Sequence, residues 1–313
     1  MRVLVTGGAG FIGSNTVDLL VSLGHDVSVV DNLVTGSRSN LHPQAAFHEV
    51  DVTDDAALQT VFERERPEAV IHLAAQMDVR ISTRRPVYDA QVNILGSLQV
   101  IEGAVRVGTR KVIYASSGGA IYGEPLYLPV REDHPVNPLS QYGVTKHTVE
   151  HYLYLYAQQR GLAYTALRYA NVYGPRQNPA GEAGVIAIFI RNLLLGLQSR
   201  IFGDGKQTRD YVYVGDVAAA NVAALHAADG MALHIGSGIE TTVNELYEQL
   251  ARILGVRHAA RHEAERPGEV LRIALDSSLA AEHLGWRPEV SLSDGLNETV
   301  DYLQTLHAEG NLA

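Results

Sequence analysis

The chain contains no cysteine and no long hydrophobic run. Disulfides and thiolate chemistry are therefore excluded, and folding needs no oxidising compartment. The longest apolar stretches, such as residues 185–190, are far shorter than the roughly 20 residues that a membrane-spanning helix needs. The chain also opens directly on a strand pattern, without a basic and then apolar leader. We therefore expect a cytoplasmic protein with no membrane partner.

Positive charge is scarce as well. The 313 residues include 25 Lys and Arg against 35 Asp and Glu, which gives a net charge of −10, and no basic cluster stands out. Nucleic acids and anionic membranes bind to basic surfaces, so neither is expected as a partner. The 13 histidines are scattered without the spacing of metal ligands, and we expect no metal site. An anionic substrate would need its own local pocket of arginines.

Glycine is concentrated near the start of the chain. Residues 2–6 form an apolar, β-branched run that predicts a buried strand, and Gly7, Gly10 and Gly13 follow it before an apolar helical pattern. A strand, a glycine turn and a helix start bring bare N–H groups and the positive end of a helix dipole together, where a pyrophosphate can bind. Glycine is needed because a β-carbon would clash with the tight turn or hold the phosphates away.

An acid follows this turn at the spacing of a dinucleotide-binding unit. Asp31 ends the second predicted strand, about twenty residues beyond the glycines. A carboxylate there can accept hydrogen bonds from both ribose hydroxyls of an adenosine, and it repels a 2′-phosphate. These features predict NAD, in preference to NADP, as the cofactor. Arg38 could offset the repulsion, but its position is more typical of a solvated loop residue.

Strand patterns alternate with helical patterns as far as residue 169. This alternation predicts an α/β fold, a doubly wound parallel sheet of the Rossmann type with a smaller mixed α/β substrate lobe. The expected cofactor domain comprises residues 1–172 and about 212–236, and the expected substrate lobe comprises about 173–211 and 237–313. Ligands lie at the carboxyl ends of the strands in such sheets. The residues expected at those ends are Asp31, Asp51, Ala74, Ser116, Ser117 and Asn171.

Two local features are also predicted. Thr53 can cap a helix over residues 54–64. The turn at residues 203–205 is typical of a hairpin between residues 200–202 and 208–214.

A tyrosine and a lysine lie four residues apart on a predicted helix over residues 140–160. Tyr142 and Lys146 would share one face of that helix. A free tyrosine has a pKa near 10, and the charges of a lysine and of an oxidised nicotinamide would favour its phenolate. The pair could exchange a proton with a hydroxyl while the nicotinamide takes hydride from the same carbon. A helix surface pair without a catalytic role is the alternative.

These segments together resemble the extended short-chain dehydrogenase/reductase family, over nearly the whole chain. The resemblance rests on residues 6–13, 31–32, 51–52, 73–75, 116–117 and the Tyr142–Lys146 pair. Residues 168–175, 209–212 and 266–269 are similar to its nucleotide-sugar branch.

The resemblance implies a tightly held NAD and a role for each matching residue. Tyr142 would be the acid/base, Lys146 would tune it and hold the nicotinamide ribose, and Ser116 and Ser117 would complete the catalytic set. The implied cofactor contacts are Gly7, Gly10, Phe11, Ile12, Gly13, Asp31, Asn32, Gly36, Asp51, Val52, Leu73, Ala74, Ala75, Gln76, Asn93, Tyr142, Lys146, Ala170 and Val172. The implied substrate contacts are Ser117, Asn171, Arg209, Arg266 and, near C2 of the sugar, Ile273. Helices 87–107 and 140–160 resemble the pair that forms the family's homodimer interface.

One departure concerns residues 118–120. Many epimerases of the family carry a third serine where this chain has Gly118, so the role of each serine is open. A 4,6-dehydratase would need an Asp-Glu pair here and a decarboxylase-type member a Glu, but the sequence is Gly-Gly-Ala. The resemblance therefore implies interconversion of UDP-glucose and UDP-galactose through a transient 4-keto sugar. Another UDP-sugar epimerase, acting on N-acetylhexosamines or glucuronate, and a non-catalytic NAD-binding module remain as alternatives.

Overall fold

The structure is a computed structural model that describes residues 1–179, 184–265 and 270–312. Among these residues, seven strands form one parallel sheet in the order β10-β6-β5-β4-β1-β2-β3. This confirms the predicted doubly wound fold. The strand bounds are β1 Arg2–Thr6, β2 Asp26–Asp31, β3 Ala46–Glu49, β4 Ala69–His72, β5 Lys111–Ser117, β6 Ala163–Tyr169 and β10 Met231–Ile235.

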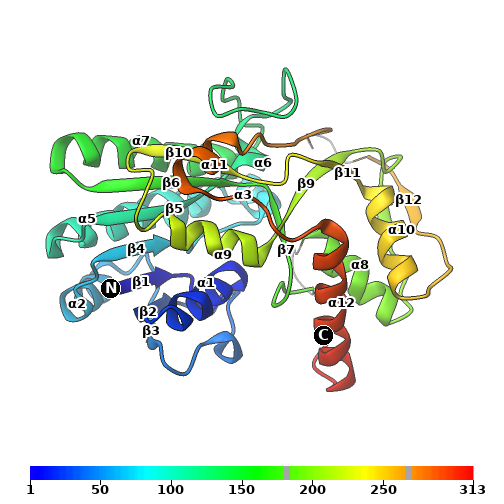
Figure 1. Cartoon of the computed structure of the whole chain (residues 1–313), viewed down its shortest axis with the longest axis horizontal. Helices are drawn as coiled ribbons and strands as arrows, with labels where there is room; N and C mark the ends of the chain where they lie inside the picture. Colours follow the sequence, from blue (N-terminus) through cyan, green and yellow to red (C-terminus); the bar gives the residue numbers. More distant parts are fainter. Residues whose placement is uncertain (180–183, 266–269, 313) are drawn as a thin grey trace.

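Helices cover both faces of this sheet (Figure 1). Successive strand residues point to opposite faces, so Val3 and Val5 pack on one side while Leu4 packs on the other. The first side carries α1 Phe11–Ser22, α9 Val214–Ala223 and α11 Ser278–Leu284. The second side carries α2 Asp55–Glu65, α5 Ser97–Val107 and α7 Gln141–Arg160.

The predicted helix over residues 87–107 is continuous but not uniform. It begins as α4 Pro86–Ala90, passes through the π-helical segment η2 Gln91–Gly96, and continues as α5. A π-helical turn widens the helix locally and is frequent at functional sites. Asn93 lies within this turn. The shorter elements on this half of the chain are η1 Arg38–Asn40, α3 Val79–Arg84 and α6 Gly118–Ile121.

A second lobe lies beside the large sheet, on the right of Figure 1. Its two small sheets are β11-β9-β7 and β12-β8, and an apolar cluster joins them to three helices. The bounds are β7 Asn171–Tyr173, β8 Arg200–Phe202, β9 Thr208–Tyr213, β11 Glu240–Thr242, β12 Arg261–Glu263, α8 Val185–Leu194, α10 Val243–Ile253 and α12 Leu292–Ala308. No helix in the described part of the chain is long and apolar enough to cross a membrane.

The two local predictions are wrong. β8 and β9 do not form a hairpin, because β8 pairs with β12 while β9 pairs with β7 and β11. The turn between them is tight, with Gly203 and Gly205 at positive φ, but it leads from one small sheet into the other. Asp54, not Thr53, caps α2, through its carboxylate and the N–H of Ala57. A charged acceptor suits the positive end of a helix dipole, and the Thr53 hydroxyl instead donates to Asp51.

Candidate active site

The glycine turn brings α1 against the end of β1 with no space for side chains. Gly7 has φ +72° and donates its N–H to the Val30 carbonyl at 2.8 Å. A β-carbon on Gly13 would lie 2.0 Å from the Gly7 carbonyl oxygen, well inside contact distance. Gly10 is the N-cap of α1, so no capping side chain covers the first-turn N–H groups. This cradle fits a pyrophosphate, as the sequence predicted.

Asp31 lies at the end of β2, beside this turn. Only 7% of its surface is exposed, and its two carboxylate oxygens accept hydrogen bonds from the N–H groups of Ala9 (3.0 Å) and Leu33 (2.8 Å). Gly36 passes close to it, since a β-carbon there would lie 3.0 Å from Asp31 Oδ1. The acid is thus held at the place where an adenosine ribose would lie beyond a pyrophosphate in the cradle.

Asp51, just after β3, lies beside the end of β2. Asn32 donates to the Asp51 carboxylate at 2.7 Å, and Thr53 donates to its other oxygen. Burial tends to raise the pKa of Asp51, but these hydrogen bonds outweigh it and the net shift is downward. A hollow of about 360 Å³ opens beside Asp51 and is also lined by Tyr88 and Gln91.

The other predicted cofactor residues come from four separate segments. Leu73 and Ala74 donate their N–H groups to the Thr6 carbonyl and hydroxyl, at 3.1 and 3.2 Å, which holds the end of β4 against the glycine turn. The Asn93 side chain makes two hydrogen bonds to the backbone of Gln76: it donates to the Gln76 carbonyl (2.9 Å) and accepts from the Gln76 N–H (2.8 Å). Half-buried residues at the rim of the apolar cluster beside α1 include Ile12, Leu73, Ala170 and Val172.

The Tyr142–Lys146 pair lies at the start of α7, against the end of β5. Lys146 is 3% exposed, and its ammonium donates to the Ala115 carbonyl at 2.7 Å. Its Nζ is 4.9 Å from the ring centroid of Tyr114 and 5.9 Å from that of Tyr142. Burial lowers the pKa of Lys146 to about 8, against the raising effect of the Asp89 charge.

Tyr142 itself does not have the lowered pKa that the sequence suggested. Burial raises the pKa of Tyr142 to about 12; a hydrogen bond with Ser117 lowers it and the Asp89 charge raises it. The expected help from Lys146 is outweighed, because its ammonium is directed to the Ala115 carbonyl and burial disfavours the phenolate. The protein alone therefore holds Tyr142 as a neutral phenol at neutral pH.

The two serines have different surroundings. Ser117 lowers the pKa of Tyr142, whereas Ser116 donates to Glu150 at 2.5 Å and is 3% exposed. Alternate residues of a strand point to opposite faces, so only one of the pair can face Tyr142. The Ser116 hydroxyl is thus directed to Glu150 and away from Tyr142, and the catalytic roles of both serines stay predictions. A β-carbon on Gly118 would lie 2.4 Å from Leu275 Cδ1, so a side chain at this position would require the Leu275 side chain to move.

Two buried carboxylates near the pair were missed in the sequence. Glu150 lies four residues beyond Lys146 and forms an ion pair with Arg168 at 2.7 Å. Burial alone would raise the pKa of Glu150, but hydrogen bonds from His147, Arg168 and Ser116 outweigh burial and the pKa is lowered. Asp89, fully buried on α4, accepts hydrogen bonds from Thr145, Asn93 and Gln76. The available signal was spacing: Tyr142, Lys146 and Glu150 recur every four residues, and so do Asp89 and Asn93.

The predicted substrate residues are only partly brought together. Asn171 pairs in register with Tyr211, and Arg209 is two residues before Tyr211 on β9, so both side chains belong to one face of the small sheet. Asn171 is exposed and Arg209 is half-buried. Ile273 is 2% exposed, in an apolar cluster with Ile121, Tyr122, Val130 and Leu275. Arg266 lies outside the described residues.

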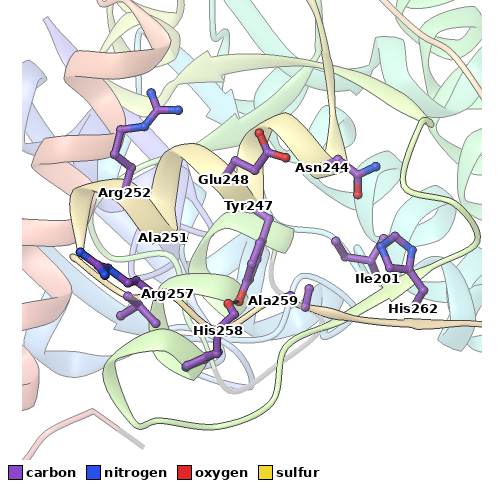
Figure 2. A pocket seen from close by; sticks show the side chains of 12 residues that line it. Ile201, Asn244, Tyr247, Glu248, Ala251, Arg252, Arg257, His258, Ala259 and His262 are labelled. Carbon is purple, nitrogen blue, oxygen red and sulfur yellow. Dashed lines mark hydrogen bonds between the residues drawn. The ribbon is translucent and has the colours of Figure 1, made fainter.

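A hollow in the second lobe is separate from this crevice. It has a volume of about 430 Å³ and lies between α10 and the segment that includes β12, and Figure 2 shows Tyr247, His258 and His262 at its wall. None of the predicted site residues lines it. Within the described part of the chain, no three His, Asp or Glu side chains come together in a way that could hold a metal ion.

A glycine turn, an acid at the end of β2 and a Tyr–Lys pair beside β5 define a dinucleotide-binding protein of the short-chain dehydrogenase/reductase class. Residues 3–236 match the pattern of the NAD dependent epimerase/dehydratase family. The chain belongs to this family, whose cofactor is NAD. The putative UDP-glucose 4-epimerase of Methanocaldococcus jannaschii is 48% identical over 302 residues, which cover 96% of this chain and 98% of that protein.

Solved structures of similar proteins agree with this membership. The UDP-glucose 4-epimerase of Thermotoga maritima with UDP-glucose has a TM-score of 0.97 and 48% identity, covering 98% of this chain and 100% of that one. The UDP-glucose 4-epimerase of Thermus thermophilus in complex with NAD has a TM-score of 0.91 and 43% identity, covering 96% of this chain and 98% of that one.

The buried carboxylate of Asp31 leads to a prediction about cofactor choice. A 2′-phosphate would face this negative charge, so protein freed of nucleotide should bind NAD at least about tenfold more tightly than NADP in calorimetric titrations. Asp31→Asn should narrow the difference, whereas Asp26→Asn, at the exposed other end of β2, should leave it unchanged. Equal affinities of the unmodified protein for both nucleotides would contradict the assignment.

Proposed function

We propose that the protein is an NAD-dependent UDP-glucose 4-epimerase that interconverts UDP-glucose and UDP-galactose. The observation that carries the proposal is the Tyr142–Lys146 pair at the start of α7, with Lys146 buried and its ammonium held by the Ala115 carbonyl at the end of β5. The similarity over nearly the full length to UDP-glucose 4-epimerases, one of them solved with UDP-glucose, supports the substrate class. Residues 118–120 offer no acid for dehydration, which also favours simple epimerisation.

Tyr142 takes the proton of the sugar 4-hydroxyl while the C4 hydrogen leaves as hydride. When bound, NAD supplies the reversible acceptor for that hydride and a positive charge that favours the Tyr142 phenolate. After the 4-keto sugar has turned its opposite face to the cofactor site, Tyr142 would give the proton back to the sugar oxygen. Ser117 hydrogen-bonds the same oxygen, and no net oxidation or reduction occurs.

The cofactor crevice is assigned to the residues that the strand ends bring together. The glycine turn holds the pyrophosphate, Asp31 the adenosine ribose, and Lys146 the nicotinamide ribose. We assign residues 1–172 with about 212–236 to this cofactor domain and about 173–211 with 237–313 to the nucleotide-sugar lobe. β10 in the large sheet and β8, β11 and β12 in the small sheets support this division, whereas α11 packs against the large sheet although it lies within 237–313.

The substrate diphosphate is assigned to Asn171, Arg209 and Arg266. The common face of Asn171 and Arg209 supports a shared anion site, because a planar guanidinium suits phosphate oxygens and the chain is acidic elsewhere. Ile273 keeps its assignment near C2 of the sugar only as a prediction, since its side chain is packed in the cluster with Tyr122. Preference for UDP-galactose over its N-acetylated analogue is part of the same prediction.

The protein is further proposed to be a homodimer. Exposed apolar side chains recur on the helical surface of α4, η2 and α7, where Val87, Leu95, Val144, Tyr154 and Leu155 are 43–71% exposed. Such a patch on adjoining helices is typical of a protein–protein interface.

The dimer proposal predicts the effect of charge on this patch. Leu95→Glu combined with Leu155→Glu should convert a dimer into a monomer, because two carboxylates would be buried at the interface. Light scattering coupled to size exclusion measures the mass directly. Leu126→Glu, at a leucine that is more exposed than either and lies outside these helices, is the control and should remain dimeric. A monomeric unmodified protein would overturn the proposal.

The proposed reaction predicts a product of unchanged mass. The purified protein, incubated separately with UDP-galactose, UDP-glucose, UDP-N-acetylgalactosamine and UDP-glucuronate, should convert the first two into each other. Chromatography separates the epimers and mass spectrometry weighs them. Loss of mass would indicate dehydration or decarboxylation instead, conversion of only the other sugars would shift the substrate class, and no reaction at all would favour the NAD-binding module.

The role of Tyr142 predicts a loss of turnover without a loss of cofactor. Tyr142→Phe should retain bound NAD and reduce turnover with UDP-galactose by at least about a hundredfold, because the proton acceptor is removed. Tyr154→Phe, which removes an exposed hydroxyl from the same helix, should behave like the unmodified protein. Turnover at the normal rate in Tyr142→Phe would exclude it from the mechanism.

A further inference from the structure

Asp89 is a buried carboxylate that the proposed reaction leaves without a role. Its side chain is fully buried on α4, one turn before Asn93. Oδ1 accepts hydrogen bonds from Gln76 Nε2 at 2.7 Å and Asn93 Nδ2 at 3.1 Å, and Oδ2 accepts one from Thr145 Oγ1 at 2.9 Å. Burying a charge is costly unless every oxygen is satisfied, and here three donors converge on two oxygens.

These three donors belong to separate parts of the site. Gln76 follows β4, and its backbone N–H and carbonyl are hydrogen-bonded to the side chain of Asn93 on η2. Thr145 lies between Tyr142 and Lys146 on α7, and it accepts a hydrogen bond from Asn93 at 3.2 Å. The Asp89 carboxylate therefore connects Gln76 and Asn93, which are predicted to contact the cofactor, with Thr145 in the first turns of α7. We call Gln76 and Asn93 the Gln76–Asn93 wall.

We infer that Asp89 is a positioning residue for the Tyr142–Lys146 pair: it joins α7 to the Gln76–Asn93 wall and supplies the buried negative charge that acts on both groups. The inference rests on the proposed function, in which Tyr142 is the acid/base. It assigns no contact with substrate to Asp89.

The charges around the pair are few. The negative charge of Asp89 raises the pKa of Lys146, of Tyr142 and of Tyr114 on β5. His72 on β4 is neutral, since burial and the Lys146 charge lower its pKa to about 3. Glu150 on α7 is paired with Arg168.

The elements packed beside Asp89 add only peripheral charges. Arg80 and Arg84 on α3 and Arg85, which precedes α4, are exposed, and Arg85 lies over the ring of Tyr88. Asp78 caps α3, and His147 on α7 bonds to Glu150. Among the described residues, Asp89 is thus the buried carboxylate whose charge affects the pKa of both Tyr142 and Lys146. The donors that hydrogen-bond to it, Gln76, Asn93 and Thr145, are all uncharged.

The sign of the effect can be predicted. Removing the Asp89 charge favours the Tyr142 phenolate and disfavours the Lys146 ammonium, so both pKa values should fall. In the NAD-loaded protein the positive charge of the cofactor opposes the effect of burial on Tyr142, and we expect the acid limb of the kcat profile to report the deprotonation of Tyr142 and the alkaline limb the loss of the Lys146 charge. In Asp89→Asn, which preserves shape, both limbs should move to lower pH by about one unit.

The experiment measures kcat for UDP-galactose from pH 5 to 10 with the NAD-loaded protein. Thr145→Val removes a hydrogen bond of the network but keeps the charge, so it should lower kcat without moving the profile. Asp216→Asn removes a different buried carboxylate, which accepts from the N–H groups of Glu289 and Val290, and should reduce thermal stability without moving the profile.

The outcomes separate the inference from the proposed function. If the pH profile of kcat for Asp89→Asn has its acid and alkaline limbs at the same pH as the unmodified protein and only a lower maximum, Asp89 has a structural role alone and the inference is overturned. Should that variant not fold, Asp89→Ser, smaller and uncharged, provides the same measurement. Absence of epimerisation by the unmodified protein would instead refute the proposed function, before any variant is compared.

Discussion

The close contact between the glycine turn and three strand ends is the constraint on which the cofactor side of the protein depends. The Gly7 amide donates to the end of β2, the Thr6 carbonyl accepts from Leu73 after β4, and Gly13 leaves no space for a β-carbon against Gly7. Because side chains are excluded at this point, backbone N–H groups face the crevice directly. The acid at Asp31 and the small residues after β4 then border the same space.

Burial sets the chemistry on the opposite wall. It raises the pKa of Tyr142 to about 12 and lowers the pKa of Lys146 to about 8, so each group is pushed toward its neutral form. A catalytic phenolate and ammonium are therefore not an intrinsic property of the Tyr-x-x-x-Lys spacing. They depend on what surrounds the pair: the Ala115 carbonyl, Ser117, the charge of Asp89 and the positive charge of a bound oxidised nicotinamide.

The second lobe and the loop before α7 are coupled through packing. Leu275 lies in the cluster of Ile121, Tyr122, Val130 and Ile273, and it approaches Gly118 so closely that a side chain there would collide. The space available at position 118 thus depends on a residue more than 150 positions later in the chain. Ser117 lowers the pKa of Tyr142 from the neighbouring position, while the Ser116 hydroxyl donates to Glu150 of the buried Glu150–Arg168 pair.

The sequence by itself determined the individual strands and helices of the large sheet, the glycine turn, the acid at the end of β2 and the spacing of Tyr142 and Lys146, because each depends on residues close together in the chain. Periodicity is local, and glycine requirements are local. It could not determine which serine faces Tyr142 or that Asp54 caps α2 in place of Thr53, since neighbouring residues compete for one partner. It also could not reveal that Asp89 meets Thr145, or that β8 and β9 separate into different sheets. The contact of Asp89 with Thr145 and the separation of β8 from β9 follow from contacts between distant segments, which only the tertiary structure brings together.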